Sequence, residues 1–566
     1  MKPSLLVCAR KRSCLRIILM AMIMTGMLQL SLGELDQASS SSERPASLGE
    51  LGTIEFPASG STEAQPHFLR GVAALHSFWY EEAIDAFRRA TSIDPNFLMG
   101  YWGEAMAHNH PIWKEENLDA ARAALQRIPD DMSSTLRERR YLHAVQTLFG
   151  EGNKLTRDQA YAAEMESIAS EYPDDREATC FYALSLLGLA THFDKEPALQ
   201  EKYRVQAGAL TLGVYGVNPN HPCAAHYTIH AFDDPIHAIL ALPQARRYAQ
   251  IAPEAPHAQH MPAHIFVQLG MWEEAAASNK AGWESSWAWV KDQQLPLLLK
   301  DYHSLYWLQY AYLQQGRYKD AEAVLAEKQR DMAQSSSGEQ AQVLGYDRKV
   351  SRNYDQMVAA QIIETERWEQ ADQPWKVNGY RLGDEAPLKA AFVREFAQSI
   401  ERLQHGATAQ HNNPESDSLF LQKMPESQKS DLSYIWSMQL GALREVNNGD
   451  YLQAVTLLDQ AVEFEDQLPP PSGPPALIKP THELYGEILL FLERPQDAQQ
   501  QFEKSLLWHP NRARSLLGLA RASARMGDLH AARQAYATFL NIWNQADPDI
   551  PELHEAKQFL QNIPHN

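Results

Sequence analysis

The stretch NPNHPCAAHYTIHAFDDPIHAILALPQARRYAQIAPEAPHAQHMPAHIFVQLGMW, residues 218–272, contains one pattern twice. Four pairs of positions in it are 34 residues apart: His226 and His260, His230 and His264, Cys223 and His257, and Pro219 and Pro253. An internal period of this length is typical of a chain built from repeated helix pairs. Each copy also contains a His-x-x-x-His pair, so the same repeat predicts both the scaffold and a candidate site.

A clearer copy of the scaffold is HFLRGVAALHSFWYEEAIDAFRRATSIDPN, residues 67–96. Its marker positions are small, aromatic or proline: Gly71, Ala83, Phe87, Ala90 and Pro95. Small residues let the two helices approach closely, the aromatic ring fills the space between them, and proline ends the second helix. This pattern resembles the tetratricopeptide repeat (TPR), a helix–turn–helix unit of 34 residues.

The repeat pattern divides the chain into regions. A TPR-like solenoid with the histidine-rich repeats is expected at 62–330, and a degenerate region of helices and loops at 331–430. Clear repeats return at 431–547, interrupted by the stiff connector PPPSGPP at 469–475, and a tail follows at 548–566. No strand-like alternation is visible, so the predicted fold is all-α: an α-solenoid whose repeats bury their apolar faces by stacking.

The N-terminus predicts export. Residues 1–33 combine a basic start, an apolar run and small residues at the end, which is the pattern of a cleaved signal peptide. The expected location is the periplasm, and the alternative is an uncleaved segment that anchors the chain in the inner membrane. Residues 34–61 are rich in Ser, Glu and Gly, and we expect a flexible tether there.

Composition excludes some partners. The chain has 566 residues with 51 basic and 71 acidic side chains, a formal net charge of −20. Nucleic acids and anionic membranes require a basic surface, so neither is an expected partner. Of the four cysteines, Cys8 and Cys14 lie in the leader; a disulfide between Cys180 and Cys223 is possible, but the sequence favours two independent thiols.

Three phrases extend the resemblance beyond the repeat itself: PNHP-x-AAHY-x-IHA, APHA-x-HMPAHIF and KPTHELYGEILL. They resemble a group of exported or periplasmic bacterial TPR proteins without an established activity. This resemblance implies no reaction, ligand or catalytic residue.

The resemblance to TPR proteins implies which side chains face the inner, concave wall. In that family the second, fifth and ninth residues of the first helix face the groove, as do residues near the thirteenth. These positions hold Cys223, His226 and His230; then His257, His260 and His264; then His303, Tyr306 and Tyr310; His76 and His110 fall at the thirteenth position.

Imidazoles on one wall suit a metal ion. Side chains four residues apart on a helix have Cβ atoms about 5–6 Å apart, and two imidazoles at that spacing can hold one ion. The expected ligands are His226, His230, His260 and His264, with His257, His303 and Cys223 as auxiliary ligands. Zinc, copper, nickel or iron would fit, and Asp233 or Asp234 could bind the ion or orient an imidazole.

A simpler alternative is that these histidines only form hydrogen bonds to neighbouring helices. His-x-x-x-His lacks the glutamate of the metalloprotease motif and is weak by itself. Pro262 lies between His260 and His264, so the helix there is expected to be irregular.

Two functions remain, and a third ranks below them. The first is a binding scaffold that holds a protein or peptide partner in the concave groove. The second is a transition-metal protein, with zinc, copper or iron in the histidine cluster. An enzyme using one histidine as a general base ranks last, because no partnered nucleophile or pair of carboxylates is visible.

Overall fold

The computed structural model describes residues 50–335, 346–405 and 430–562, apart from positions 131, 379, 381, 384 and 385. The leader predicted at 1–33 therefore lies outside the described residues, as does most of the loop predicted at 405–430. Residues 48–566 form one compact unit. Within the described residues, no helix combines the length and apolarity needed to cross a bilayer.

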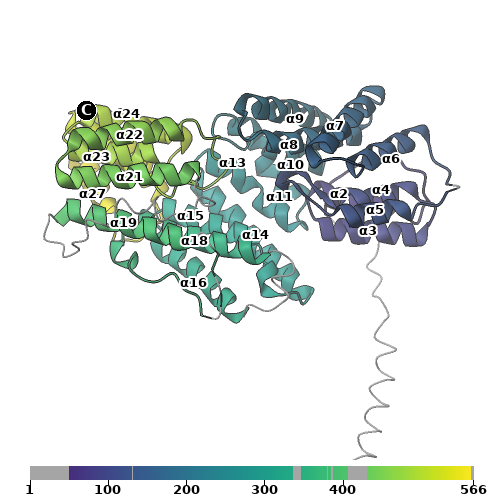
Figure 1. Ribbon diagram of the computed structural model, residues 1–566, viewed down its shortest axis with the longest axis horizontal. Coiled ribbons are helices and arrows are strands. Elements are labelled where there is room, and N and C mark those ends of the chain that lie inside the picture. The colour runs from purple at the N-terminus through teal and green to yellow at the C-terminus, as the bar shows by residue number, and fades with distance from the viewer. Residues whose placement is uncertain are drawn as a thin grey trace, which may run out of the picture. The chain divides into compact units, whose positions relative to one another are not determined.

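The described chain is a succession of helices (Figure 1). The helices before the second histidine pair are α2 (Gln65–His76), α3 (Tyr80–Ile93), α4 (Leu98–Met106), α5 (Leu118–Gln126), α6 (Leu136–Leu148), α7 (Lys154–Glu171), α8 (Arg176–Ala190), α9 (Pro197–Val217), α10 (Pro222–Ala231) and α11 (Leu242–Ile251). The middle helices are α12 (Pro256–His260), α13 (Pro262–Gln268), α14 (Trp272–Asp292), α15 (Tyr302–Gln314), α16 (Tyr318–Gln334), α18 (Tyr346–Thr365) and α19 (Ala386–His405). The last are α21 (Asp431–Asn448), α22 (Tyr451–Glu465), α23 (Thr481–Phe491), α24 (Pro495–Trp508), α25 (Ala513–Arg525), α26 (Leu529–Ile542) and α27 (Pro551–Asn562).

Short elements join some of these helices. They are the 3-10 turns η1 (Pro111–Trp113), η2 (Thr191–Phe193), η3 (Ala238–Ala241), η4 (Leu297–Leu299) and η5 (Trp368–Gln370), and the strands β1 (Asn109–His110) and β2 (Glu115–Glu116). The two strands pair antiparallel, with Asn109 opposite Glu116. The all-α class predicted from the sequence is confirmed, with this hairpin as a small addition.

Close packing of each helix pair depends on an aromatic ring facing glycines. A Cβ atom placed on Gly71 or Gly103 would lie 2.7 or 2.3 Å from the Phe87 ring. Near the C-terminus, the Phe502 ring packs in the same way against a glycine on α23 and a glycine on α25. Neighbouring helices can therefore approach until the ring fills the space between them, and the arrangement repeats along the chain.

Order begins earlier than the sequence indicates. Leu51 and Phe56 are buried in the core, and the Phe56 ring lies 5.7 Å from that of Trp102. The Thr53 N–H donates to the carbonyl of Asn220 at 2.9 Å. The prediction of a flexible tether over 34–61 is therefore wrong for residues 50–61, because two apolar side chains anchor this segment despite its polar composition.

The C-terminal repeats contact loops and helices more than 200 residues earlier in the sequence. The indole N–H of Trp272 donates to the Asn511 carbonyl, and the indole N–H of Trp543 donates to the Gln314 carbonyl. The connector at 469–475 also touches α13, where Gln268 donates to the Pro471 carbonyl at 2.7 Å. These contacts place the chain's own C-terminal part against the helices that follow the histidine repeats.

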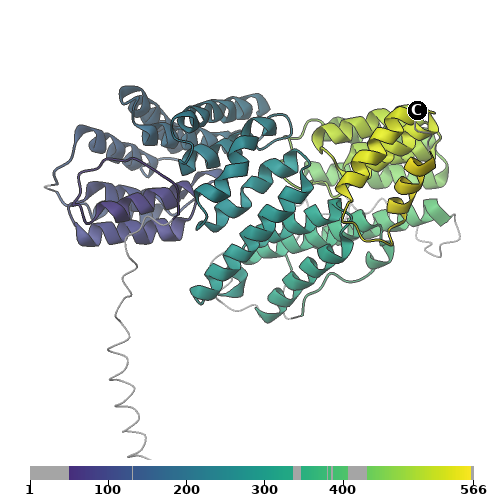
Figure 2. The same cartoon turned by 180° about the vertical axis from the view of Figure 1, so that it is seen from behind.

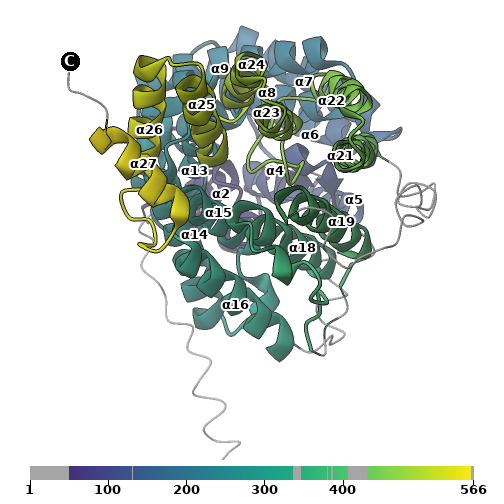
Figure 3. The same ribbon diagram turned by 90° about the vertical axis from the view of Figure 1, so that its left-hand side faces the viewer.

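The tail predicted at 548–566 is wrong over most of its length. Helix α27 occupies Pro551–Asn562 and packs on α26, as Figures 2 and 3 show. Leu553 and Ala556 are buried, and the Phe559 ring lies 4.5 Å from that of Tyr536. A helix of this length covers the apolar face that the last repeat would otherwise expose.

We predict that Gly103→Ala lowers the free energy of unfolding by about 1–3 kcal/mol, because the added methyl group collides with the buried Phe87 ring. Gly213→Ala is the matched control. Gly213 also lies within a helix, but nothing is within 4 Å of its added Cβ, so this change should stabilise by roughly 0.5–1 kcal/mol. Urea unfolding midpoints of the two variants test the difference; equal shifts would contradict the packing argument.

Candidate metal centre

The first His-x-x-x-His pair lies on α10. His226 and His230 are one helical turn apart, and their Nε2 atoms are 3.1 Å from each other. His226 is fully buried, while His230 is partly buried. The expected i, i+4 geometry is therefore present in this repeat.

The second pair keeps the same geometry across a break in the helix. Met261 separates α12 from α13 but has helical backbone angles, φ −53° and ψ −34°. Pro262 removes one N–H donor without turning the chain aside, because its fixed φ suits a helix. His260 and His264 consequently have their Nε2 atoms 3.1 Å apart, as in the first pair. The irregular helix is real, but it does not separate the two imidazoles.

Each pair is completed by a third histidine from the next repeat. His226, His230 and His257 form the first histidine cluster, and His260, His264 and His303 form the second. Within each cluster, one possible ligand atom from every residue lies within 4.8 Å of the other two. The four principal histidines and the two auxiliary ones predicted from the sequence therefore come together as two groups of three.

The Nδ1 atoms of three of these rings are bound to fixed acceptors. His226 Nδ1 lies 2.6 Å from the His76 carbonyl oxygen, and His260 Nδ1 lies 2.7 Å from Asn279 Oδ1. His264 Nδ1 lies 2.7 Å from a carboxylate oxygen of Asp233. Since these oxygens only accept, each Nδ1 must carry the hydrogen. The Asn279 amide is oriented by its other end, which donates to the Ala275 carbonyl.

In the second histidine cluster this arrangement leaves two lone pairs facing each other. His260 and His264 both donate a hydrogen bond from Nδ1. In the neutral form of either residue, Nε2 therefore carries no hydrogen and presents a bare lone pair. Two bare nitrogens 3.1 Å apart repel unless a proton or a metal ion lies between them. The first cluster is different, because no described acceptor holds Nδ1 of His230, and His230 can carry its hydrogen on Nε2.

His257 lacks the partner that a buried polar atom normally has. Its Nε2 is buried and, among the described residues, has no hydrogen-bond partner. Its ring lies 5.0 Å from that of His226 and 6.2 Å from that of His260. An unsatisfied buried nitrogen at the junction of two histidine clusters suggests a ligand that supplies the missing interaction.

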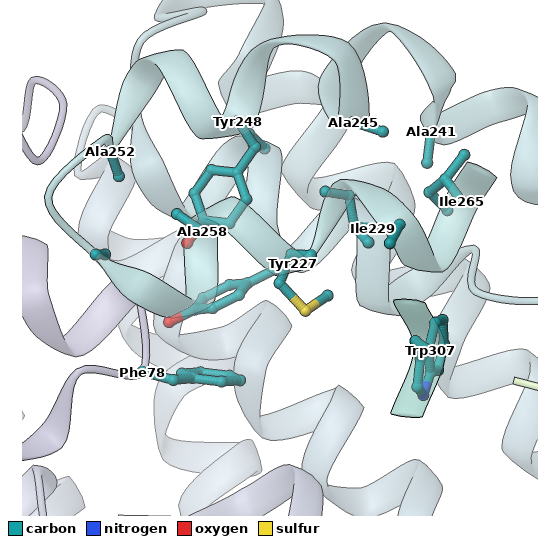
Figure 4. Close-up of a cluster of buried hydrophobic side chains, with 14 of the residues drawn as sticks. Phe78, Tyr227, Ile229, Ala241, Ala245, Tyr248, Ala252, Ala258, Ile265 and Trp307 are labelled. Carbon is teal, nitrogen blue, oxygen red and sulfur yellow. The ribbon is translucent and has the colours of Figure 1, made fainter. Parts of the chain in front are cut away.

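Aromatic side chains enclose both clusters. The Phe78 ring is 4.3 Å from that of His226, and Tyr248 stacks on the other side of His226 at 5.0 Å. The Trp307 ring is 4.4 Å from that of His264. Figure 4 shows Phe78, Tyr248 and Trp307 among the apolar residues around these helices. The enclosure keeps water away from most of the imidazole surface.

Burial keeps these imidazoles neutral. It lowers the pKa of four residues well below 6.5, and the neighbouring imidazoles lower it further: His226, His230, His257 and His260. A neutral imidazole is the form that binds metal. At neutral pH the clusters therefore present ligands that need not lose a proton from a charged ring.

The structure corrects the role of Cys223. Cys180 and Cys223 form a disulfide between α8 and α10, so the prediction of two independent thiols is wrong. Cys223, at the second position of its repeat, consequently offers no thiolate to the first histidine cluster. The pairing arises because α8 and α10, distant by 43 residues at these cysteines, are packed against each other.

His76 also differs from its expected place on an open wall. It is completely buried, with Nε2 2.5 Å from Glu177 and Nδ1 2.9 Å from the Tyr227 hydroxyl. His221 binds the other oxygen of Glu177 at 2.9 Å. Burial alone would raise the pKa of Glu177, but the two imidazoles hold it at about 2. His76 thus belongs to a buried ionic network beneath the first cluster, which it supports through its backbone carbonyl.

The other residues expected in the groove are partly or wholly covered. Tyr310 is buried, and its hydroxyl accepts a hydrogen bond at 2.7 Å from Arg512 of the C-terminal repeats. Tyr306 is only partly buried, and His110 stacks on Tyr80 with 3.9 Å between ring centroids. The open groove predicted at Tyr310 and His76 is therefore wrong, because the C-terminal repeats or buried partners occupy those positions.

Several important residues escaped the sequence analysis. Phe78, Trp307 and Asn279 enclose or orient the imidazoles, but no repeat position distinguishes them. Asp233 was one of two acidic candidates, and the structure separates them: Asp233 binds His264, whereas Asp234 pairs with Arg204 and His237. Only the three-dimensional placement of these elements resolves such roles.

The comparisons with known proteins agree with the helical repeats. Residues 64–97 match the family model described as tetratricopeptide repeat. The chain therefore contains a tetratricopeptide repeat (TPR). No curated protein matches this TPR protein at a significant level.

Similarity to solved structures is loose. The APC/C hetero-tetramer Cut9–Hcn1 is 12% identical, covering 91% of this chain and 78% of that chain, with a TM-score of 0.32. A human IFIT1 dimer with m7Gppp-AAAA is 12% identical, covering 89% and 90%, with a TM-score of 0.32. Yeast Tom70 is 11% identical, covering 88% of each chain, with a TM-score of 0.26. We base no inference about function on similarities this low.

We predict that the metal-free TPR protein loses stability as the pH falls below about 6.5, the ordinary pKa of histidine. The buried rings of His226 and His260 stay neutral in the folded chain but gain a proton in the unfolded one, so acid favours unfolding. The urea midpoint of the wild type should be lower at pH 5 than at pH 7. The variant His226→Gln with His260→Gln should show a smaller fall, and an unchanged or rising wild-type midpoint would contradict the argument.

Proposed function

We propose that this TPR protein binds two transition-metal ions, one in each histidine cluster. The observation that carries the proposal is the pair His260 and His264, whose Nε2 atoms face each other at 3.1 Å while both Nδ1 atoms donate elsewhere. A metal ion would replace the repulsion between the lone pairs with two bonds. For bonds of about 2.0–2.1 Å in a tetrahedral arrangement, nitrogens about 3.3 Å apart are expected, close to the separation found.

The donor set limits the kind of ion. Each cluster offers three imidazoles, and Asp233, a carboxylate beside the second cluster, is occupied by hydrogen bonds to His264 and Gln268. Imidazole suits zinc, copper, nickel and iron, whereas magnesium, calcium and manganese prefer oxygen. The bonds from Nδ1 to Asp233, Asn279 and the His76 carbonyl are the outer interactions that hold metal-binding imidazoles in place.

Metal analysis of protein purified without a histidine tag tests this proposal. We expect two ions per chain in the wild type after loading with zinc or copper and removal of excess metal. His260→Gln with His264→Gln should remove one ion, because the second cluster then keeps only His303. His226→Gln with His230→Gln should remove the other.

The matched control is His143→Gln. His143 lies on α6, its side chain is 63% exposed, and its Nε2 is 3.7 Å from a carboxylate oxygen of Glu164. This variant should keep both ions, which separates cluster binding from adventitious binding to surface histidines. A metal content that is the same in the wild type and in both double variants, with helix content unchanged by circular dichroism, would end the proposal.

We propose a second, compatible function as a scaffold for a protein partner, on the C-terminal repeats. TPR repeats support protein interaction in general. Here an open pocket of about 460 Å³ lies between α22 and the α23–α24 turn, lined by Tyr451, Leu452, Val455, Phe491, Leu492, Glu493 and Arg494. Three of these apolar side chains are exposed together, Tyr451 at 47%, Leu452 at 80% and Phe491 at 49%, and a contiguous exposed apolar patch is typical of an interaction surface.

This second function predicts that Leu452→Ser weakens capture of a partner from extracts of the source organism at least several-fold without changing the metal content. A polar residue at this exposed position should cost little stability, so weaker capture would reflect the loss of the pocket's apolar surface rather than unfolding. Leu507→Ser is the control, since this leucine on α24 is 67% exposed and does not line the pocket. Equal capture by both variants in quantitative cross-linking would argue against this pocket.

We also propose that the protein acts outside the cytoplasm. The predicted leader at 1–33 supports export, and the Cys180–Cys223 disulfide adds an independent reason, since disulfides persist mainly in oxidising compartments. An imidazole-rich site in such a compartment would meet metal ions directly from the surroundings.

A further inference from the structure

The two histidine clusters lie directly beside each other. The ring of His230 in the first cluster is 6.1 Å from that of His264 in the second, and His257 is 6.2 Å from His260. These rings belong to different clusters yet are as close as His230 and His257 within one cluster, which are 6.2 Å apart. Ions bound in both clusters would therefore be neighbours.

Charge favours monovalent ions for this pair. Imidazole is a neutral ligand, and the cost of burying an ion rises with the square of its charge. Asp233, hydrogen-bonded to His264, is one compensating anion, and Asp301 at the start of α15 is another. Arg204 lies near His230 but pairs with Asp234. Arg352 and Lys328 also lie near His303 and add positive charge on that side. Two divalent ions would therefore add more positive charge than these carboxylates can offset, and two monovalent ions would add half as much.

Among the metals that imidazole suits, copper is the one with a stable monovalent state. Copper(I) is satisfied by three ligands, which is the number each cluster supplies. The aromatic walls formed by Phe78, Tyr248 and Trp307 keep the surroundings apolar. Each copper(I) ion would then keep an open position that water fills poorly.

We propose that the two clusters form one dinuclear copper centre that binds dioxygen between its ions; this inference rests on the proposed metal-binding function. In the binding step each copper(I) gives one electron, and dioxygen takes both to become a peroxide bound to two copper(II) ions. Two copper–oxygen bonds form, the order of the oxygen–oxygen bond falls from two to one, and no proton or further reductant is needed. His303 lies at the exposed edge of the second cluster and marks the route by which a small molecule enters.

The experiment loads the full-length, disulfide-intact protein with copper(I) under anaerobic conditions and then admits a measured amount of dioxygen. We expect two copper(I) ions per chain and uptake of one dioxygen for each pair of ions. An intense near-ultraviolet charge-transfer band should appear, and the oxidised pair should give no electron paramagnetic resonance signal, because the two spins couple.

The test variant is His257→Gln, and His143→Gln is the control. Without His257 the first cluster keeps two ligands and should lose its ion, while the second cluster keeps its three. Air oxidation should then give a mononuclear copper(II) signal of about one spin per chain, with at least tenfold less dioxygen bound. The control should behave like the wild type.

Three results would be decisive against the inference. Two bound coppers that oxidise to two uncoupled spins would show that the ions do not share a ligand. Dioxygen uptake unchanged by His257→Gln would place that reaction elsewhere. Stable occupation by two zinc ions that copper(I) cannot displace would exclude a copper centre while leaving metal binding intact. Failure of the proposed function itself looks different, because the wild type would then retain no metal.

Discussion

Stacking of helix pairs is the constraint on which the rest of this molecule depends. No pair can bury its apolar face alone, so each must pack against the next, and the Phe87 ring between two glycines sets how closely they approach. Because the same packing recurs, a given position of one helix comes to lie beside the same position one repeat later. Two His-x-x-x-His pairs in phase therefore had to become neighbours in space once the repeats stacked.

Most of the fold follows from the sequence for this reason. The 34-residue period, the small residues and the prolines predict the helix pairs, and the same period predicts that His226, His230, His260 and His264 converge. The grouping into two sets of three could not be predicted. His257, at the start of α12, completes the preceding pair rather than its own, and sequence spacing does not encode that grouping.

The remaining surprises come from long-range contacts. Arg512 reaches Tyr310 across 202 positions, and Gln268 reaches Pro471 across 203. Nothing local in either segment indicates the meeting, because both read as ordinary repeats or linkers. The consequence is functional: an inner wall that the repeat pattern presents as open is, near α13 and α15, covered by the chain's own later repeats. Residues that orient the imidazoles, such as Asn279, are equally invisible without the fold.

The disulfide between α8 and α10 changes which ligands the chain offers to a metal ion before and after the bond forms. The structure holds Cys180 and Cys223 as a disulfide, with the imidazole of His221 beside them. Thiolates hold copper(I) and zinc more tightly than imidazoles do, so in a reduced chain these two cysteines would compete with the proposed histidine clusters for metal. Forming the disulfide removes both thiolates from that competition. If the clusters bind metal as proposed, a chain that closes this bond first would offer incoming ions its histidines alone.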